Sequence, residues 1–214
     1  MMQRRWAVKK RSVIVGGSLC VLIAAPLAVR AWAMQDQAEK PPAAADMAAM
    51  MEQARKFTQP GEHHKLLERW IGKWSTETRF FMGGQATPAE KGTIETKWLM
   101  PGRWLMSETK GTMMGMPSHS VIMMGYDNFK MSYVFTAVSN MDTAMLRAEG
   151  DMDPSGKTLI MYGTLDEYLT GEHDKMVKYL WRFESDDKTI MEIHDLPIGE
   201  NNTKVIEIVA TRVK

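Results

Sequence analysis

The chain has 214 residues, of which 44% are hydrophobic and 25% are charged, and it contains one cysteine and 21 methionines. This length suits one globular domain with an additional segment, since a domain usually takes roughly 100–200 residues. A single cysteine cannot form a disulfide within the chain, so a disulfide-stapled mini-protein is excluded. Apolar residues spread along the whole length also exclude a collagen-like or wholly disordered protein.

Residues 1–33 have the pattern of a secretory signal peptide. A basic start precedes an uncharged run over residues 12–29 and a small-x-small cleavage pattern, Ala31-Trp32-Ala33. We expect cleavage near Ala33 and a periplasmic or secreted protein, by either the general or the twin-arginine route. The alternative is an uncleaved anchor, because a run of this length can just span a bilayer.

Cleavage would change the net charge of the protein. Residues 1–33 hold six of the 27 basic residues and none of the 26 acidic ones, so the mature chain would carry a net charge of −5. Nucleic acids and anionic membrane surfaces prefer a basic patch. We therefore expect no nucleic-acid partner, no membrane partner after cleavage, and a monomer or weak dimer.

The mature chain is expected to begin with a linker and a helical segment. Residues 34–45 are polar, rich in alanine and contain Pro41-Pro42, which is typical of a flexible linker. Asp46 can cap a helix that runs to about Phe57, and a second helical stretch follows over residues 62–71. The expected N-terminal helical segment therefore covers residues 46–72.

From Trp74 onward the hydrophobic period changes to two, as in Ile94, Thr96, Trp98 and Met100. We expect a barrel domain over residues 73–214. The sequence predicts ten strands, at about 74–82, 90–100, 103–110, 119–126, 130–138, 144–152, 157–166, 175–185, 188–196 and 203–213. Short turns between them force antiparallel neighbours. Ten such strands avoid exposed edges by closing, so we predict an all-β, up-and-down antiparallel barrel, with an open two-sheet sandwich as the alternative.

Two motifs strengthen the barrel prediction by resemblance. Gly72-Lys73-Trp74 opens the first strand after a short helix, and Arg212 lies on the last strand. This arrangement resembles the calycin superfamily, which includes the lipocalins. The resemblance implies that the Trp74 indole closes one end of the barrel beneath the Arg212 guanidinium, a stacking that cation–π attraction favours.

A longer set of motifs resembles the bacterial domain-of-unknown-function 1579 family. It comprises Thr112-Met-Met-Gly-Met-Pro117, Gly125-Tyr-Asp-Asn128 and residues 151–158, together with upstream segments around Pro60-Gly61 and Lys97-Trp98. The resemblance covers roughly residues 45–214. The resemblance implies a lipocalin-like barrel, but it implies no established activity and no catalytic residues.

Aromatic residues on the central strands suggest a ligand pocket. If they face inward, they can line a site for a small hydrophobic molecule, with a few polar groups that fix its pose. The candidate ligand-binding residues are Trp98, Tyr126, Tyr133, Trp181 and His119. The alternative is a barrel filled by its own Met and Trp side chains. We expect a non-enzymatic binder of a small hydrophobic molecule.

Two other functions remain open at this point. An enzyme of unknown reaction could use His194 with Glu192, or His119, at the barrel mouth. The loop with Met113, Met114 and Met116 could anchor a protein partner, or bind Cu(I) together with His119. The methionines also suit simple packing of the core. No pair of histidines has the spacing of zinc ligands, and a haem site at His194 lacks support. We therefore predict no metal and no cofactor, and we name no catalytic residue.

Overall fold

The computed structural model describes residues 44–167, 170–196 and 203–214. The predicted signal peptide and residues 34–43 of the predicted linker lie outside the described residues. The helical elements are α1 (Ala44–Thr58), α2 (Glu62–Leu66) and the 3₁₀ turn η1 (Leu67–Trp70). Helix α1 thus begins two residues before the predicted start, and the second predicted helix is divided into α2 and η1.

Helix α1 buries none of its residues, and its last turn contacts the loop that contains Asn128 and Phe129. The Phe57 ring stacks on Phe129 with centroids 4.0 Å apart. The Asn128 side-chain amide donates hydrogen bonds to the carbonyl oxygens of Phe57 and Gln59, at 3.2 and 2.8 Å. Among the described helices, none has the length and apolar character needed to cross a membrane.

Eleven strands follow the helices in the described part of the chain. They are β1 (Gly72–Met82), β2 (Gln85–Ala86), β3 (Glu90–Met100), β4 (Trp104–Met113), β5 (Met116–Asp127), β6 (Ser132–Ser139), β7 (Leu146–Met152), β8 (Thr158–Glu167), β9 (Glu172–Ser185), β10 (Lys188–Asp195) and β11 (Thr203–Arg212). Strand β2 is a two-residue return that pairs with the end of β1. The other ten correspond to the ten predicted strands, with ends that agree to within three residues.

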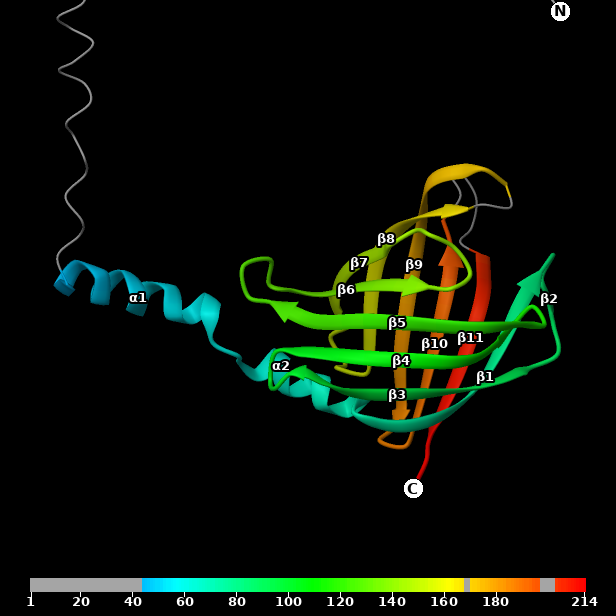
Figure 1. Ribbon diagram of the computed structural model, residues 1–214, viewed down its shortest axis with the longest axis horizontal. Coiled ribbons are helices and arrows are strands. Elements are labelled where there is room, and N and C mark those ends of the chain that lie inside the picture. Colours follow the sequence, from blue (N-terminus) through cyan, green and yellow to red (C-terminus); the bar gives the residue numbers. More distant parts are fainter. Residues whose placement is uncertain (1–43, 168–169, 197–202) are drawn as a thin grey trace, which may run out of the picture. The chain divides into compact units, whose positions relative to one another are not determined.

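These ten strands close into a barrel. Consecutive strands pair antiparallel around the sheet, and β11 returns to pair with β1 from Trp74↔Arg212 to Phe80↔Ile206. In Figure 1, β3, β4 and β5 cross in front of β9, β10 and β11. The structure therefore confirms the predicted antiparallel barrel, in which closure leaves no long unpaired edge.

Alternation along each strand divides inner from outer residues. On β9, Val177, Tyr179, Trp181 and Phe183 are buried, while the residues between them are more exposed. Successive side chains of a strand point to opposite faces, so this row faces the interior. The same inner rows from all ten strands supply the core and the walls of a cavity.

One end of the barrel is plugged by α2 and η1. Leu67 is fully buried there, and Trp70 packs edge-on against Phe183 with centroids 4.6 Å apart. The Tyr133 hydroxyl donates a hydrogen bond to the His63 carbonyl at 3.0 Å, which ties α2 to β6. Because this end is filled, open space inside the barrel lies toward the opposite end, which we call the mouth.

Candidate ligand-binding cavity

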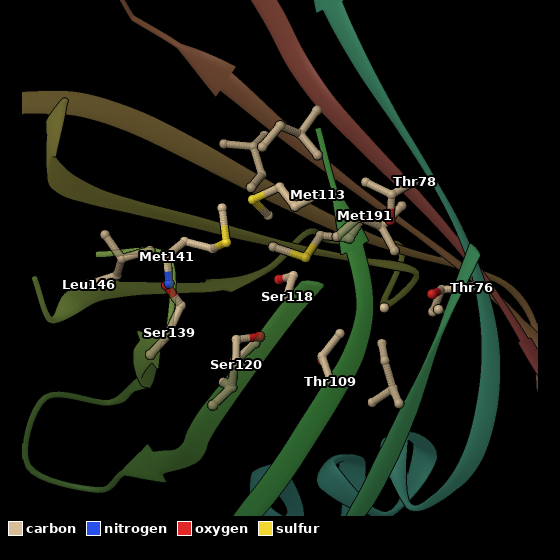
Figure 2. Close-up of a pocket in the computed structure, with 18 of the residues that line it drawn as sticks. Thr76, Thr78, Thr109, Met113, Ser118, Ser120, Ser139, Met141, Leu146 and Met191 are labelled. Atoms are coloured by element: carbon tan, nitrogen blue, oxygen red, sulfur yellow. The ribbon is translucent and has the colours of Figure 1, made fainter. Parts of the chain in front are cut away.

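A cavity of about 470 Å³ occupies the barrel interior. Its floor includes Trp70 and Trp74 at the helical end, and it reaches the mouth at the β4–β5 and β6–β7 turns, where Met113 and Met141 line it. Figure 2 shows the labelled side chains of Met113, Met141 and Met191 extending into this space. A cavity of this size falls within the usual range for small-molecule sites, roughly 300–1,000 Å³.

One wall of the cavity is rich in hydroxyl groups. It is formed by β1, β3, β4 and β5, and its hydroxyl side chains are Thr76, Thr78, Thr96, Ser107, Thr109, Ser118 and Ser120. Figure 2 shows Thr76, Thr78, Thr109, Ser118 and Ser120 around the cavity. We call this set the hydroxyl wall. Its side chains alternate with outward residues such as Met106 and Glu108 on β4, as the pleat requires.

The wall built by β8 to β11 is mainly apolar. Its lining side chains include Leu165, Tyr179, Trp181, Met191, Ile193, Ile206, Ile208 and Ala210. Thr189 is a hydroxyl residue of this wall, and it pairs with Phe183 near the plugged end. The strands of the hydroxyl wall also supply apolar lining residues such as Phe80, Ile94 and Ile122. The two sides of the lumen therefore differ in their content of hydroxyl groups.

Two polar atoms near the cavity are buried without a hydrogen-bond partner among the described residues. They are the Tyr179 hydroxyl and the Trp70 indole nitrogen, and both residues line the cavity. Burial raises the pKa of Tyr179 to about 12, so its hydroxyl stays protonated. Unpaired buried polar groups are uncommon in folded proteins, and an unseen water or ligand is one accepted reason for them.

Charged residues touch the cavity only near the mouth, within the described part of the chain. They come from the ends of strands or from the loop after β6, and they are Lys91, Lys110, Asp142, Asp166, Glu167 and Asp195. Asp195 forms an ion pair with Lys175 at 2.7 Å, and both side chains are about four-fifths buried. Deeper in the lumen the polar groups are neutral.

The structure separates the aromatic residues that the sequence singled out. Trp181 lines the cavity. Tyr126 and Tyr133 instead pack edge-on with centroids 4.9 Å apart at the plugged end, where the His63 ring stacks on Tyr126. Trp98 is half-buried against the same core. These three residues fill the barrel rather than border its open space.

His119 also lies outside the cavity. It is on the outer face of β5, and its ring is 2.8 Å from the Glu108 carboxylate, with about half of the side chain exposed. Of the neighbouring methionines, Met113 and Met114 line the cavity mouth, whereas Met116 does not line the cavity. The loop therefore brings two thioethers to the mouth without the imidazole.

His194 and Glu192 are close together but face away from the lumen. Their side chains approach to 3.3 Å on the outer face of β10, while Met191, Ile193 and Asp195 point inward. Lys204 and Arg182 lie near the same carboxylate. Burial raises the pKa of Glu192, but the hydrogen bond from His194 and these two cations outweigh it and leave the pKa below its ordinary value.

Both histidine pairs therefore lie outside the lumen, where the alternative of an enzyme would need its acid–base groups. Each pair is on the outer face because it alternates with inward residues on its own strand. The side chains of His194 and Glu192 are nevertheless more than four-fifths buried. Among the described residues, no three His, Cys, Asp or Glu side chains gather in a way that could hold a metal ion.

Sequence comparison identifies the family. Residues 59–212 match the family described as protein of unknown function DUF1579. The chain belongs to this family. The resemblance seen in the sequence motifs is thus confirmed. A search of curated proteins gave no match to this sequence.

Solved structures show what the fold is similar to. Rv2717c from M. tuberculosis is similar with a TM-score of 0.54 at 9% identity, over 73% of this chain and 100% of that chain. The S-type phycobiliprotein lyase CPES from Guillardia theta gives 0.45 at 10% identity, over 74% and 96%. A redesigned beta barrel gives 0.36 at 12% identity, over 71% and 96%. At these identities the first similarity concerns the fold alone, and the other two are too weak for any argument.

The hydroxyl wall was not among the sites predicted from the sequence. Aromatic residues were the predicted lining because ligand pockets are lined mainly by hydrophobic and aromatic side chains. A detectable signal was present: Ser107 and Thr109 on β4, and Ser118 and Ser120 on β5, repeat at a period of two. Polar residues at that period are usually the solvated face of a strand, so the inner and outer faces of β4 and β5 were hard to distinguish.

Proposed function

We propose that this protein is a non-enzymatic binder of a small, largely apolar molecule, held in the barrel lumen. The observation that carries the proposal is the cavity of about 470 Å³ beside Trp181, Met191 and the isoleucines of β10 and β11. Burial of apolar surface drives such binding, at about 25 cal/mol per Å² removed from water.

The placement of titratable groups supports binding over catalysis. Acid–base catalysis requires a titratable group within hydrogen-bond reach of the reacting atom of the bound molecule. The pairs His194–Glu192 and His119–Glu108 lie on the outer face. The inner polar groups away from the mouth are hydroxyls and the Trp70 indole, which can orient a ligand but are poor proton carriers at neutral pH.

The proposal can be tested with a neutral fluorescent naphthylamine, N-phenyl-1-naphthylamine, titrated into the purified mature protein. Met191→Trp places a bulky ring in the lumen, and Met123→Trp makes the same change on the exposed outer face of β5. We expect micromolar binding by the wild type, at least tenfold weaker binding by Met191→Trp, and unchanged binding by Met123→Trp.

Circular dichroism and melting curves establish that each variant is folded. Ile208→Phe provides a second, smaller obstruction in the lumen if Met191→Trp fails to fold. Absence of probe binding by the wild type, or equal binding by the lumen and surface variants, would reject the proposal.

We propose further that the protein acts outside the cytoplasm. The support is the order of the first 33 residues, in which a basic start is followed by an uncharged apolar run and a small-x-small cleavage pattern. N-terminal sequencing of the protein from the envelope fraction of its own cells tests this. A start near Met34 is expected, whereas an intact N-terminus in the cytosolic fraction would overturn it.

A further inference from the structure

Part of the hydroxyl wall lies close together on neighbouring strands. Thr109 on β4 lies opposite Ser120 on β5, and Ser120 lies opposite Ser139 on β6, which also lines the cavity. Two isoleucines interrupt the wall: Ile94 lies opposite Thr109, and Ile122 lies opposite Ser107. Closer to the floor, the Thr96 and Ser107 hydroxyls are 2.8 Å apart and hydrogen-bond each other. Neighbouring inner residues on paired strands lie about 5 Å apart, which suits contact with several oxygens of one small molecule.

Part of this patch has free hydrogen-bonding capacity. No hydrogen bond to another described residue involves the side chains of Thr109, Ser118 or Ser120, and all three are half-buried rather than sealed. A hydroxyl can donate one hydrogen bond and accept two. These groups are therefore available to whatever occupies the lumen.

Two glycines widen the space beside the patch. Gly92 and Gly111 lie opposite each other on β3 and β4, in the same inner rows as Thr76 and Ser118. A Cβ on Gly92 would come within 2.8 Å of the Thr76 hydroxyl oxygen and the Lys110 carbonyl. The absence of side chains here leaves the hydroxyls near the mouth uncovered.

The ring order of the strands places this patch across the lumen from the apolar wall. Ten strands surround the lumen in sequence, so β4 and β5 lie five positions away from β9 and β10. A molecule in the cavity therefore meets Thr109 and Ser120 on one side and Trp181 and Met191 on the other. The charged residues remain at the mouth, so a buried ionic group would lose its hydration without an opposite charge.

On the basis of the proposed binding function, we propose that the lumen selects uncharged, ring-sized molecules with hydrogen-bonding oxygens on one side and an apolar opposite side. The oxygens face Thr109, Ser118 and Ser120, and the apolar side faces Trp181 and Met191. The expected ligand class is therefore a neutral ring compound that carries hydroxyl or carbonyl groups on one side. A fatty acid or a uniformly apolar hydrocarbon has a different pattern.

Competition with the naphthylamine probe tests the pattern. Three competitors of similar size are compared: naphthalene, a naphthalene diol with adjacent hydroxyls on one edge, and its isomer with hydroxyls at opposite ends. The two diols have the same composition and differ only in where the oxygens lie. We expect the one-edge diol to bind about tenfold more tightly than its isomer, because one or two net hydrogen bonds separate them.

Substitutions in the hydroxyl wall test whether its side chains cause the preference for the one-edge diol. Thr109→Val and Ser120→Ala remove hydroxyls from the lumen with little change in volume, and each should reduce the preference for the one-edge diol to less than threefold. Thr93→Val is the matched control, since Thr93 is exposed on the outer face of β3, and it should keep the full preference.

The outcomes separate this inference from the binding function itself. If the probe binds in the lumen but all three competitors bind equally, or the wall variants keep the full preference, the polarity assignment is wrong and the binding function stands. If the probe fails to bind at all, the binding function fails and the assignment fails with it.

Discussion

The Arg212 guanidinium carbon lies 4.0 Å from the centroid of the Trp74 ring, on paired residues of the last and first strands. The same guanidinium donates hydrogen bonds to the carbonyl oxygens of Ile71 (2.5 Å), Arg69 (2.9 Å) and Asp186 (3.0 Å). One side chain therefore joins η1, the β9–β10 turn and the closing strand pair. This arrangement seals the plugged end below the cavity.

Replacing this side chain should open that end. We expect Arg212→Lys to lower the free energy of unfolding by about 2–3 kcal/mol, because an ammonium cannot reach three carbonyls and stack at once. Urea denaturation measures the change. Lys214→Met removes a neighbouring exposed cation and should change stability by less than about 0.5 kcal/mol. Equal effects of the two substitutions would contradict the closure role.

Gly72 is needed so that Arg212 can reach the Ile71 carbonyl. Its φ is +126°, and a Cβ there would lie 2.7 Å from the Arg212 Nη1. We expect Gly72→Ala to cost about 1–3 kcal/mol of stability through this strain and contact. Gly61→Ala is the control, since a Cβ at Gly61 meets nothing within 4 Å.

A double-mutant cycle separates the two causes at Gly72. If contact with Arg212 contributes, Gly72→Ala should cost less in the Arg212→Lys background, with a coupling of about 0.5 kcal/mol or more. Strictly additive free energies would show that backbone strain alone explains the glycine.

Two buried tyrosines should respond oppositely to loss of their hydroxyls. Tyr133 donates a hydrogen bond to the His63 carbonyl, whereas the Tyr179 hydroxyl has no partner among the described residues. We expect Tyr133→Phe to lose about 1 kcal/mol of stability and Tyr179→Phe to be neutral or stabilising. Thermal and urea unfolding measure both. A clear loss in Tyr179→Phe would mean that a bound water or ligand pairs with that hydroxyl.

His64 should make stability depend on pH. Burial lowers the pKa of His64 below the ordinary 6.5, a hydrogen bond with the Tyr126 backbone partly opposes this, and Arg103 and His63 add to the lowering. The His64 Nδ1 accepts a hydrogen bond from the Gly61 amide at 3.0 Å. The unfolded chain then binds the proton more readily than the folded one, so the stability from neutral His64 is full above about pH 6.5 and falls as the pH drops below it.

Urea unfolding at about pH 7.5 and pH 5.5, on either side of the ordinary histidine pKa, tests this. The His64→Gln variant should be less stable than the wild type at the higher pH. Its free energy of unfolding should, however, fall less than that of the wild type when the pH is lowered from about 7.5 to about 5.5. An equal loss in both proteins would show that another group governs the acid sensitivity.

The sequence by itself determined the number and order of the ten barrel strands, and it gave no sign of the two-residue return β2. Alternating residues such as Ile94, Thr96 and Trp98, and turns such as Pro101-Gly102, are local signals that require no knowledge of distant contacts. The Gly72-Lys73-Trp74 motif and Arg212 likewise indicated how one end closes. The family assignment came from the same local motifs.

The tertiary structure alone decided which side chains face the lumen and what fills it. Tyr126 and Tyr133 lie on inner faces, but α2 covers them, a contact between segments some 70 residues apart. Ser120 and Thr109 became lumen groups because β11 pairs with β1 and fixes the inner face of every strand between them. A shift of one residue in register would invert each of these assignments, and only the closed set of pairings excludes that shift.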